Sequence, residues 1–127
     1  MGYLVDSNVL IDYAAERFTS EQLLQLDAIF DQELNVSVIT EIETLGFAAA
    51  AEEDQKMQLL FRTAQIIELS KAVIHKTISL RRGIKIKTPD AIIAATAMVN
   101  GLTLITRNIK DFEGIPGLKI INPHILI

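Results

Sequence analysis

Short apolar segments alternate with helical patterns along most of the chain, and this alternation limits the fold more than any other feature. The segments are rich in valine, isoleucine and leucine, and stretches with apolar residues at helical spacing separate them. We predict strands at residues 3–5, 35–40, 65–69, 102–106 and 118–121. Strands joined by helices run parallel, and a parallel sheet needs helices on both faces. The sequence therefore predicts a three-layer α/β fold with a parallel central sheet flanked by helices.

Helix signals fall between the predicted strands. We expect capping side chains to open helices at Ser7, Thr19, Ser70 and Thr88. Pro89 then occupies the first position of the last of these helices. From residue 41 onward the predicted helices cover about 41–51, 52–64, 70–83 and 88–100. The stretch AIIAATAMV within the last one is apolar on every side, which predicts a buried helix.

Size and composition narrow the class of protein. The 127 residues fit a single domain, residues 1–127, and half of them are hydrophobic. There is no cysteine, which excludes disulfides and thiolate metal sites. We see no signal peptide or apolar span, so we expect a cytoplasmic protein that has no membrane partner. Residues 1–64 carry a net charge of −9, and residues 65–127 carry one of +5. The basic half could bind phosphates, but two ordinary solvated surfaces explain the charge asymmetry equally well.

Three acidic residues fall where an open parallel sheet binds ligands, beyond the carboxyl ends of its strands, and Asp90 is a fourth candidate. Asp6 ends the first predicted strand, Glu43 follows the second, and Asp111 follows the fourth. Asp90 lies in the first turn of the apolar helix. A helix macrodipole favours an acid in the first turn by about 0.3–1 kcal/mol, which explains any one of them structurally. Asp90 is harder to explain in this way, because an unpaired carboxylate beside apolar residues is costly. A cation among several carboxylates would remove that cost.

Four segments occur in order along residues 4–112, and they read LVDSNVLID, SVITEIETLGF, TPDAIIAATA and LITRNIKDF. Together they resemble the motifs of the PIN-domain family, in particular those of VapC-type toxins. The resemblance implies a PIN-like fold and an endoribonuclease in which Asp6, Glu43 and Asp90 bind Mg²⁺ or Mn²⁺, the ions that oxygen-only ligands suit. One or two ions would activate a water for attack on the RNA phosphodiester, and one carboxylate would accept a proton. The resemblance also implies a homodimeric toxin that a small antitoxin protein silences.

Two positions need a choice or depart from the family pattern. Glu41 competes with Glu43 for the second acidic role, but residues two apart on a helix point about 200° apart, so one site cannot use both. The family pattern favours Glu43, although Thr44 stands where leucine is more usual. Many PIN domains have an aspartate directly after the Thr-Arg pair, whereas this chain has Asn108 there and Asp111 three residues later. We therefore expect Asp111 to supply the missing catalytic, metal-binding carboxylate, directly or through a water.

Several polar residues around these acids are candidates for substrate contact. We predict that Asn8 orients Asp6 or a bound water, that Arg107 contacts a phosphate, and that Asn108 faces the metal-bound water or the substrate. A run of cations before Asp90 could also contact phosphates or simply stabilise the carboxyl end of a helix, and it comprises Arg81, Arg82, Lys85 and Lys87.

Other polar residues are expected to be structural. Asp12 and Glu16 are four residues apart and predict a solvated helix face rather than part of the site. Neither His75 nor His124 has a second histidine or a cysteine clustered with it in the sequence, so we do not expect either to bind a metal.

Three other functions remain open from the sequence. A haloacid-dehalogenase-like phosphatase also begins with a strand that ends in aspartate, but it needs a second aspartate where this chain has Asn8. A catalytically weak or dead PIN fold that binds RNA or a partner is kept open by Asn108. A PIN nuclease that acts in RNA processing, with no antitoxin, is the third.

Overall fold

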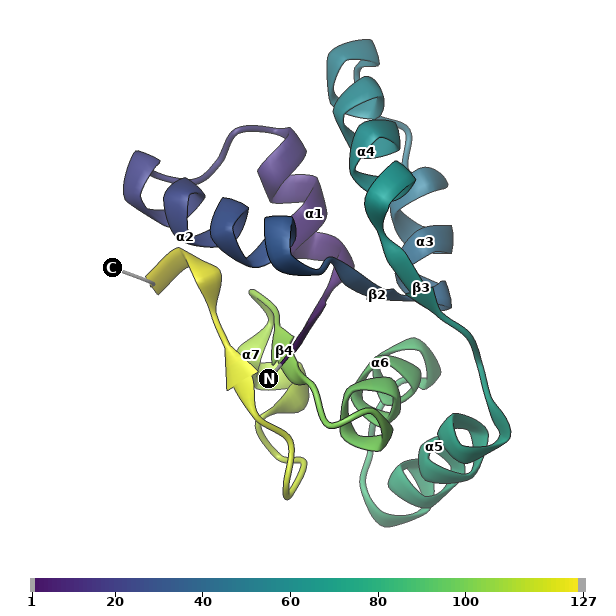
Figure 1. Ribbon diagram of the computed structural model, residues 1–127. Coiled ribbons are helices and arrows are strands. Elements are labelled where there is room, and N and C mark those ends of the chain that lie inside the picture. The colour runs from purple at the N-terminus through teal and green to yellow at the C-terminus, as the bar shows by residue number, and fades with distance from the viewer. Residues whose placement is uncertain (1, 126–127) are drawn as a thin grey trace.

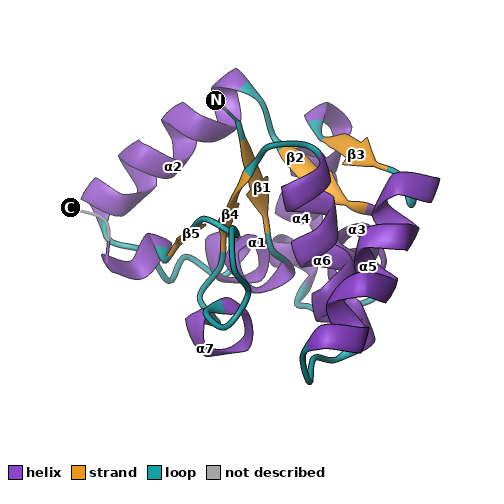
Figure 2. Ribbon diagram, turned by 90° about the horizontal axis from the view of Figure 1, so that it is seen from below, coloured by secondary structure: helices purple, strands orange, loops and turns teal. Residues whose placement is uncertain are grey.

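The computed structural model describes residues 2–125, and a five-stranded parallel sheet lies at its centre. The strands are β1 (Tyr3–Val5), β2 (Asn35–Ser37), β3 (Gln65–Ile67), β4 (Thr103–Ile105) and β5 (Ile120–Ile121). Their order is β3-β2-β1-β4-β5, which Figure 2 shows from one edge of the sheet to the other. Val5 of β1 is in register with Ile105 of β4, so the residues that follow these two strands emerge side by side.

Helices cover both faces of this sheet (Figure 1), and the predicted three-layer α/β fold is confirmed. They are α1 (Ser7–Ala14), α2 (Ser20–Gln32), α3 (Val38–Leu45), α4 (Ala51–Thr63), α5 (Lys71–Gly83), α6 (Thr88–Val99) and α7 (Ile109–Phe112), followed by the 3₁₀ turn η1 (Pro123–Ile125). None of the helices within residues 2–125 has the length and apolar character needed to cross a bilayer.

Two hydrophobic cores result, one on each face of the sheet. Neighbouring residues of a strand point to opposite faces, and Leu4 and Val5 accordingly belong to different cores. Leu4 packs with residues of α5, α6 and α7, whereas Val5 packs with residues of α1, α2 and α4. Helix α3 contacts α1 and α4 as well as α6. It therefore connects the two helical layers close to the carboxyl ends of the strands.

Helix α6 is the buried helix that the sequence predicts. Its central residues from Ala91 to Ala97 are buried except Ile92, and four of them are alanines. Small side chains allow neighbouring elements to approach closely, and α6 packs against α5 and β4. Asp90 is half-buried at the start of this helix. A well-packed helix thus fixes the position of that carboxylate.

Several predicted boundaries are wrong by a few residues. The second strand ends at Ser37 rather than at residue 40, because the Ser37 hydroxyl accepts a hydrogen bond from Ile39 N at 3.0 Å and caps α3. The helix predicted at residues 41–51 therefore begins earlier and ends at Leu45, and α4 begins at Ala51 after a short loop. Strands β3, β4 and β5 are each shorter than predicted. Each strand extends only as far as its residues pair with a neighbouring strand, and the sequence does not reveal where pairing stops.

Two of the four predicted helix caps are confirmed and two are wrong. Thr19 forms the predicted capping box with Gln22, and Ser70 caps α5 through Val73 N. Ser7, however, is the first residue of α1, and the cap is the Asp6 carboxylate. Thr88 is likewise the first residue of α6, after an N-cap at Lys87 that makes no side-chain capping bond. The Ser7 hydroxyl is therefore free to make a bond outside its own helix.

Candidate active site

The carboxylate of Asp6 is the most firmly held group at the carboxyl edge of the sheet. It lies directly after β1 and is only 5% exposed. Its Oδ1 accepts a hydrogen bond from Ser7 N at 2.8 Å, while its Oδ2 accepts from Asn8 Nδ2 at 2.9 Å and from Thr106 Oγ1 at 2.8 Å. Three donors from two adjacent strand ends thus fix this side chain.

Ser7 connects Asp6 to the acid on α3. While its backbone N–H donates to Asp6, its Oγ donates to Glu43 Oε1 at 2.5 Å. Ser7 therefore holds the carboxylate of its neighbour Asp6 next to that of Glu43, which lies 36 residues after Ser7 in the chain. Glu43, which the family pattern favours over Glu41, is the glutamate of α3 that reaches this edge through Ser7.

Asp90 faces the other acids from the start of α6. Its pKa is raised above the usual value, first by burial and then by the negative charges of Asp111, Asp6 and Glu43, while Lys87 acts in the opposite direction. The pKa of Asp6 is also raised, mainly by burial and in part by Glu43, although its hydrogen bonds from Thr106, Ser7 and Asn8 counteract the rise. The structure thus brings all four predicted acids into one electrostatically coupled group.

The segment after β4 brings Asp111 to this group. Asp111 lies on the short helix α7, and its charge has the largest effect of any charge on Asp90. Asn108, where the family pattern has an aspartate, is the N-cap residue of α7, and its backbone N donates to Thr106 Oγ1 at 3.1 Å. Asn108 is exposed and adjoins the group without adding a charge to it.

The donor set suits a hard divalent cation. All four acids offer oxygen ligands. Two of them have pKa values that like charges raise in part, and a bound cation would lower these pKa values. Within the described chain, no three His, Cys, Asp or Glu side chains already close around a single point. Mg²⁺ keeps several of its waters and is commonly bound by only one or two carboxylates, so such closure is not required. The residues present therefore fit a hydrated ion.

Thr106 and Asn8 provide the two side-chain hydrogen bonds to Asp6, and Thr106 is not among the residues that the sequence predicts for the site. Thr106 is fully buried directly after β4, and its hydroxyl both donates to Asp6 and accepts from Asn108 N. Asn8 donates to Asp6, as its predicted orienting role requires, and its Oδ1 accepts from Arg107 N at 2.9 Å. A hydroxyl residue at the end of the strand beside β1 was the signal that could have identified Thr106.

Asp12 contradicts the prediction of a solvated helix face, since it is fully buried. Its Oδ2 lies 2.9 Å from Arg107 Nη1 and 2.8 Å from His124 Nε2, and its Oδ1 lies 3.0 Å from Arg17 Nη1. The ring of His124 also stacks on Phe18, with 4.3 Å between the ring centroids. Arg107 is therefore anchored in the protein by one nitrogen, an arrangement that its predicted phosphate role did not include.

The remaining polar predictions are simpler. Glu16 is exposed and pairs with Lys56 at 2.6 Å, which lowers the pKa of Glu16 through a hydrogen bond and the lysine charge. His75 is exposed on α5. The surface beside Asp90 and Asp111 is hollowed, and the cations Arg81, Lys85 and Lys87 line this cavity, whereas Arg82 is not among its lining residues.

The chain is similar in sequence to proteins of a known family. A family model described as PIN domain matches residues 3–118 of the chain. Ribonuclease VapC1 of Methanocaldococcus jannaschii is 31% identical over 124 residues, an alignment that covers 92% of this chain and 85% of that protein. All four acids lie inside the matched residues.

Solved structures share the fold across nearly the whole chain. A toxin–antitoxin complex from Klebsiella pneumoniae contains a chain that is 34% identical, with a TM-score of 0.76 and coverage of 98% of this chain and 100% of that chain. VapBC2 from Rickettsia felis, bound to a DNA fragment from its promoter, contains a chain with 24% identity and a TM-score of 0.80, covering 96% and 98% of the two chains. The second likeness concerns the fold alone.

Proposed function

We propose that this chain, which belongs to the PIN-domain family, is a metal-dependent endoribonuclease that hydrolyses RNA phosphodiester bonds. The observation that carries this proposal is the group of four carboxylates, from Asp6, Glu43, Asp90 and Asp111, at the carboxyl edge of a parallel sheet. Their mutual repulsion does nothing for the fold, and perturbed acids gathered in this way are typical of functional sites. Relatives named as VapC ribonucleases support RNA as the substrate.

Asp6, Glu43 and Asp90 would hold Mg²⁺ or Mn²⁺, with Asp111 binding directly or through a water. When bound, the ion supplies a water of lowered pKa and neutralises charge on the phosphate. Asp6 is already oriented by three hydrogen-bond donors, so its ordering costs little when the ion binds. Glu43 accepts a hydrogen bond from the Ser7 hydroxyl and can exchange that hydrogen bond for contact with the ion or with one of its waters.

The neighbouring polar residues would act on the substrate. Asn8 keeps Asp6 and the segment at Arg107 in fixed positions, while Asn108 is exposed beside the carboxylates and can donate to a phosphate oxygen or a water. Arg107 contacts Asp12 through Nη1, and its half-exposed guanidinium can present its other N–H groups to a phosphate. Hydrolysis adds the oxygen of one water to phosphorus and breaks one P–O bond. One carboxylate accepts the water proton, and the leaving oxygen takes up a proton.

We further propose that the protein is the toxin of a toxin–antitoxin pair, acts as a homodimer in the cytoplasm, where cellular RNA is available, and is silenced by a small antitoxin protein. The likeness to the Klebsiella pneumoniae toxin–antitoxin complex supports this role. Ile42 and Leu45 are large apolar side chains exposed three residues apart on α3, and Phe47 is exposed just after this helix. Neighbouring exposed apolar side chains are a feature of surfaces that bind other proteins.

The proposal is tested by incubating a mixed RNA pool with the purified protein in Mg²⁺, in Mn²⁺ and in EDTA. We expect cleavage with either metal and none in EDTA. Asp6→Asn should abolish cleavage while the far-ultraviolet circular dichroism spectrum is retained. Glu41→Gln is the matched control, because Glu41 is an acid on α3 that lacks the connection of Glu43 to Ser7 and Asp6. Equal activity of Asp6→Asn and the natural protein would refute the proposed site.

A catalytically weak RNA-binding module is the second candidate, because Asn108 stands where the family pattern has a charged residue. RNA that is bound in Mn²⁺ but left intact would favour this module. A nuclease unrelated to toxins would cleave RNA in the same assay. It would not arrest growth when expressed alone, whereas the proposed toxin would.

A further inference from the structure

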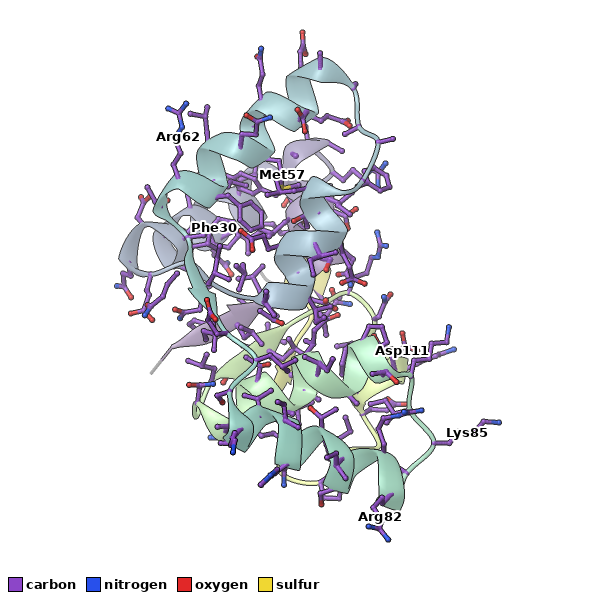
Figure 3. The ribbon with its side chains drawn as sticks, turned by 90° about the vertical axis from the view of Figure 1, so that its right-hand side faces the viewer. Phe30, Met57, Arg62, Arg82, Lys85 and Asp111 are labelled. Atoms are coloured by element: carbon purple, nitrogen blue, oxygen red, sulfur yellow. The ribbon has the colours of Figure 1, made fainter. Side chains whose placement is uncertain are left out.

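A cavity of about 510 Å³ opens beside the candidate active site, and four cations surround it. Arg81 comes from the last turn of α5, Lys85 and Lys87 come from the segment between α5 and α6, and Lys110 comes from α7. Two of the acids, Asp90 and Asp111, line the same cavity. Figure 3 shows Lys85 and Asp111 at the same edge of the molecule, with Arg82 pointing away from it. The cavity is therefore continuous with the carboxylate group.

The four cations outnumber the two acids that line the same cavity, so these acids, one of which already interacts with the charge of Lys87, do not balance all four. Within residues 2–125, the Lys and Arg ion pairs with carboxylates shorter than 4.0 Å involve Arg17, Lys56 and Arg107, and none of these lines the cavity. Arg81 donates to the backbone oxygen of Ile86 at 3.4 Å, which keeps it beside the cavity without neutralising it. All four side chains belong to exposed residues. Cations grouped in this way attract an anion.

Stabilisation of a helix end does not explain the whole group. A cation in the last turn of α5 is favoured by the helix macrodipole, and this applies to Arg81 and equally to Arg82. Lys85 and Lys87 lie beyond the end of α5, and Lys110 lies on a different element. The three elements have the cavity in common rather than a helix terminus. The gathering of cations therefore indicates a ligand.

We propose that this cavity binds a backbone phosphate of the RNA strand next to the bond that is cleaved, an inference that rests on the proposed function. The ligand is a phosphodiester, because four cations suit a strong anion and offer no aromatic surface on which a base could stack. Asp90 and Asp111 line both the cavity and the carboxylate group, which puts the bound phosphate beside the scissile one. The cations also offset the repulsion between those carboxylates and an incoming strand. Contacts of this kind position RNA without reading its sequence.

The test compares two double variants that carry the same change in charge. Lys85→Gln/Lys110→Gln removes two cations from the cavity, whereas Lys71→Gln/Lys119→Gln removes two exposed cations from elsewhere in the basic half. The probe is a fluorescein-labelled, mixed-sequence single-stranded RNA of twelve nucleotides, with Ca²⁺ in place of Mg²⁺ to slow cleavage. Fluorescence anisotropy gives Kd over a range of salt concentrations. Arg82→Gln serves as a single control for Arg81→Gln, because both residues lie at the same helix end.

Each neutralised phosphate contributes about 0.7 to the slope of log Kd against log salt for a single strand, so the cavity variant should lose about 0.7 of the slope. If the contribution of that phosphate vanishes near 1 M salt, Kd at 0.1 M should rise about fivefold. In cleavage with Mg²⁺, KM should rise while kcat changes little, because the contact binds substrate and transition state alike. The control double variant should keep the natural slope and KM.

Equal slopes for the two double variants would overturn the cavity as a phosphate site. Cleavage by the natural protein in the same experiment would leave the proposed function standing, so the two failures are distinguishable. Inorganic phosphate provides a further arm. Should phosphate alone compete with the RNA at micromolar concentration, the cavity would be a site for the free ion, and the inference of a strand-binding subsite would be refuted.

Discussion

Asp12 forms a buried junction whose removal should have a large and measurable effect on stability. Its carboxylate accepts from Arg107 Nη1 at 3.0 and 2.9 Å, from Arg17 Nη1 at 3.0 Å, and faces His124 Nε2 at 2.8 Å. Asp12→Asn removes the charge and replaces one acceptor oxygen with a donor that faces these groups. Hydrogen bonds to charged groups contribute about 1.5–3 kcal/mol each. Water reaches the side chains of Arg17 and Arg107, which are 59% and 46% exposed, and it lowers their contributions.

We therefore expect Asp12→Asn to lower the free energy of unfolding by about 2–4 kcal/mol. Urea unfolding of the metal-free protein, followed by circular dichroism and extrapolated linearly, measures this change. Arg17→Gln is the matched control. It removes one exposed partner and leaves Arg107 on the carboxylate, so it should cost at most about 1 kcal/mol. A loss below about 0.5 kcal/mol for Asp12→Asn would refute the assignment of a buried, fully engaged carboxylate.

Asp12 is connected to the candidate active site through Arg107 but not through Arg17. Arg107 contacts Asp12 through Nη1, and its backbone N–H donates to Asn8, which in turn donates to Asp6. Arg17 pairs with Asp12 from the segment that follows α1, and this pair does not form part of that chain of bonds. Arg107→Gln should therefore lower kcat, by about tenfold if Asn8 loses its position, whereas Arg17→Gln should leave kcat unchanged. Equal kcat values for the two variants would remove Arg107 from the site.

Three further predictions concern the carboxylates. Asp90→Asn should nearly abolish cleavage yet stabilise the metal-free protein. Because the pKa of Asp90 is raised above 3.8 in the folded state, the stability linked to this group is present below that pH and is lost as pH rises through the raised pKa. In thermal melts the melting temperature of the variant should therefore rise relative to that of the natural protein toward neutral pH, and a lower melting temperature there would contradict this. Glu43→Gln should weaken Mn²⁺ binding in calorimetry while Glu41→Gln changes it little, and the reverse result would mean that the wrong face of α3 had been assigned. Asn108→Asp should tighten Mn²⁺ binding by roughly tenfold. In that background Asp111→Asn should weaken Mn²⁺ binding less than it does in the natural protein, and additive effects on the affinity would mean that the two residues do not share an ion.

The fold and the positions of the acids could be predicted because both follow from local rules. Alternating strand and helix patterns require a parallel sheet, and the carboxyl ends of parallel strands lie at one edge, so the sequence predicts that Asp6, Glu43 and Asp111 lie there. The apolar surface of α6 revealed that it is buried and made Asp90 unusual at its start. These inferences need only the order of elements and the chemistry of single residues.

The errors concern features that depend on distant partners. Asp12 has the spacing of an exposed helix face, but its partners Arg107 and His124 lie 95 and 112 residues further along the chain. Ser7 has the chemistry of a cap, yet the neighbouring Asp6 carboxylate occupies that role and leaves the Ser7 hydroxyl to Glu43. Thr106 is an ordinary strand residue in the sequence, and its role follows from the pairing of β4 with β1. Strand pairing and tertiary packing, rather than local pattern, determine all three.

The most direct test of the central claim is the chemistry of the cleaved ends in water enriched in oxygen-18. Attack by water on phosphorus places one solvent oxygen on the product phosphate, whereas attack by the 2′-hydroxyl of RNA leaves a cyclic phosphate. Mass spectrometry of the products with Mg²⁺ distinguishes the two. We predict one oxygen-18 atom in each new terminal phosphate, no cyclic phosphate, no products with EDTA and almost none with Asp90→Asn. Cyclic phosphate ends, or equal cleavage in EDTA, would contradict hydrolysis by a metal held among Asp6, Glu43, Asp90 and Asp111.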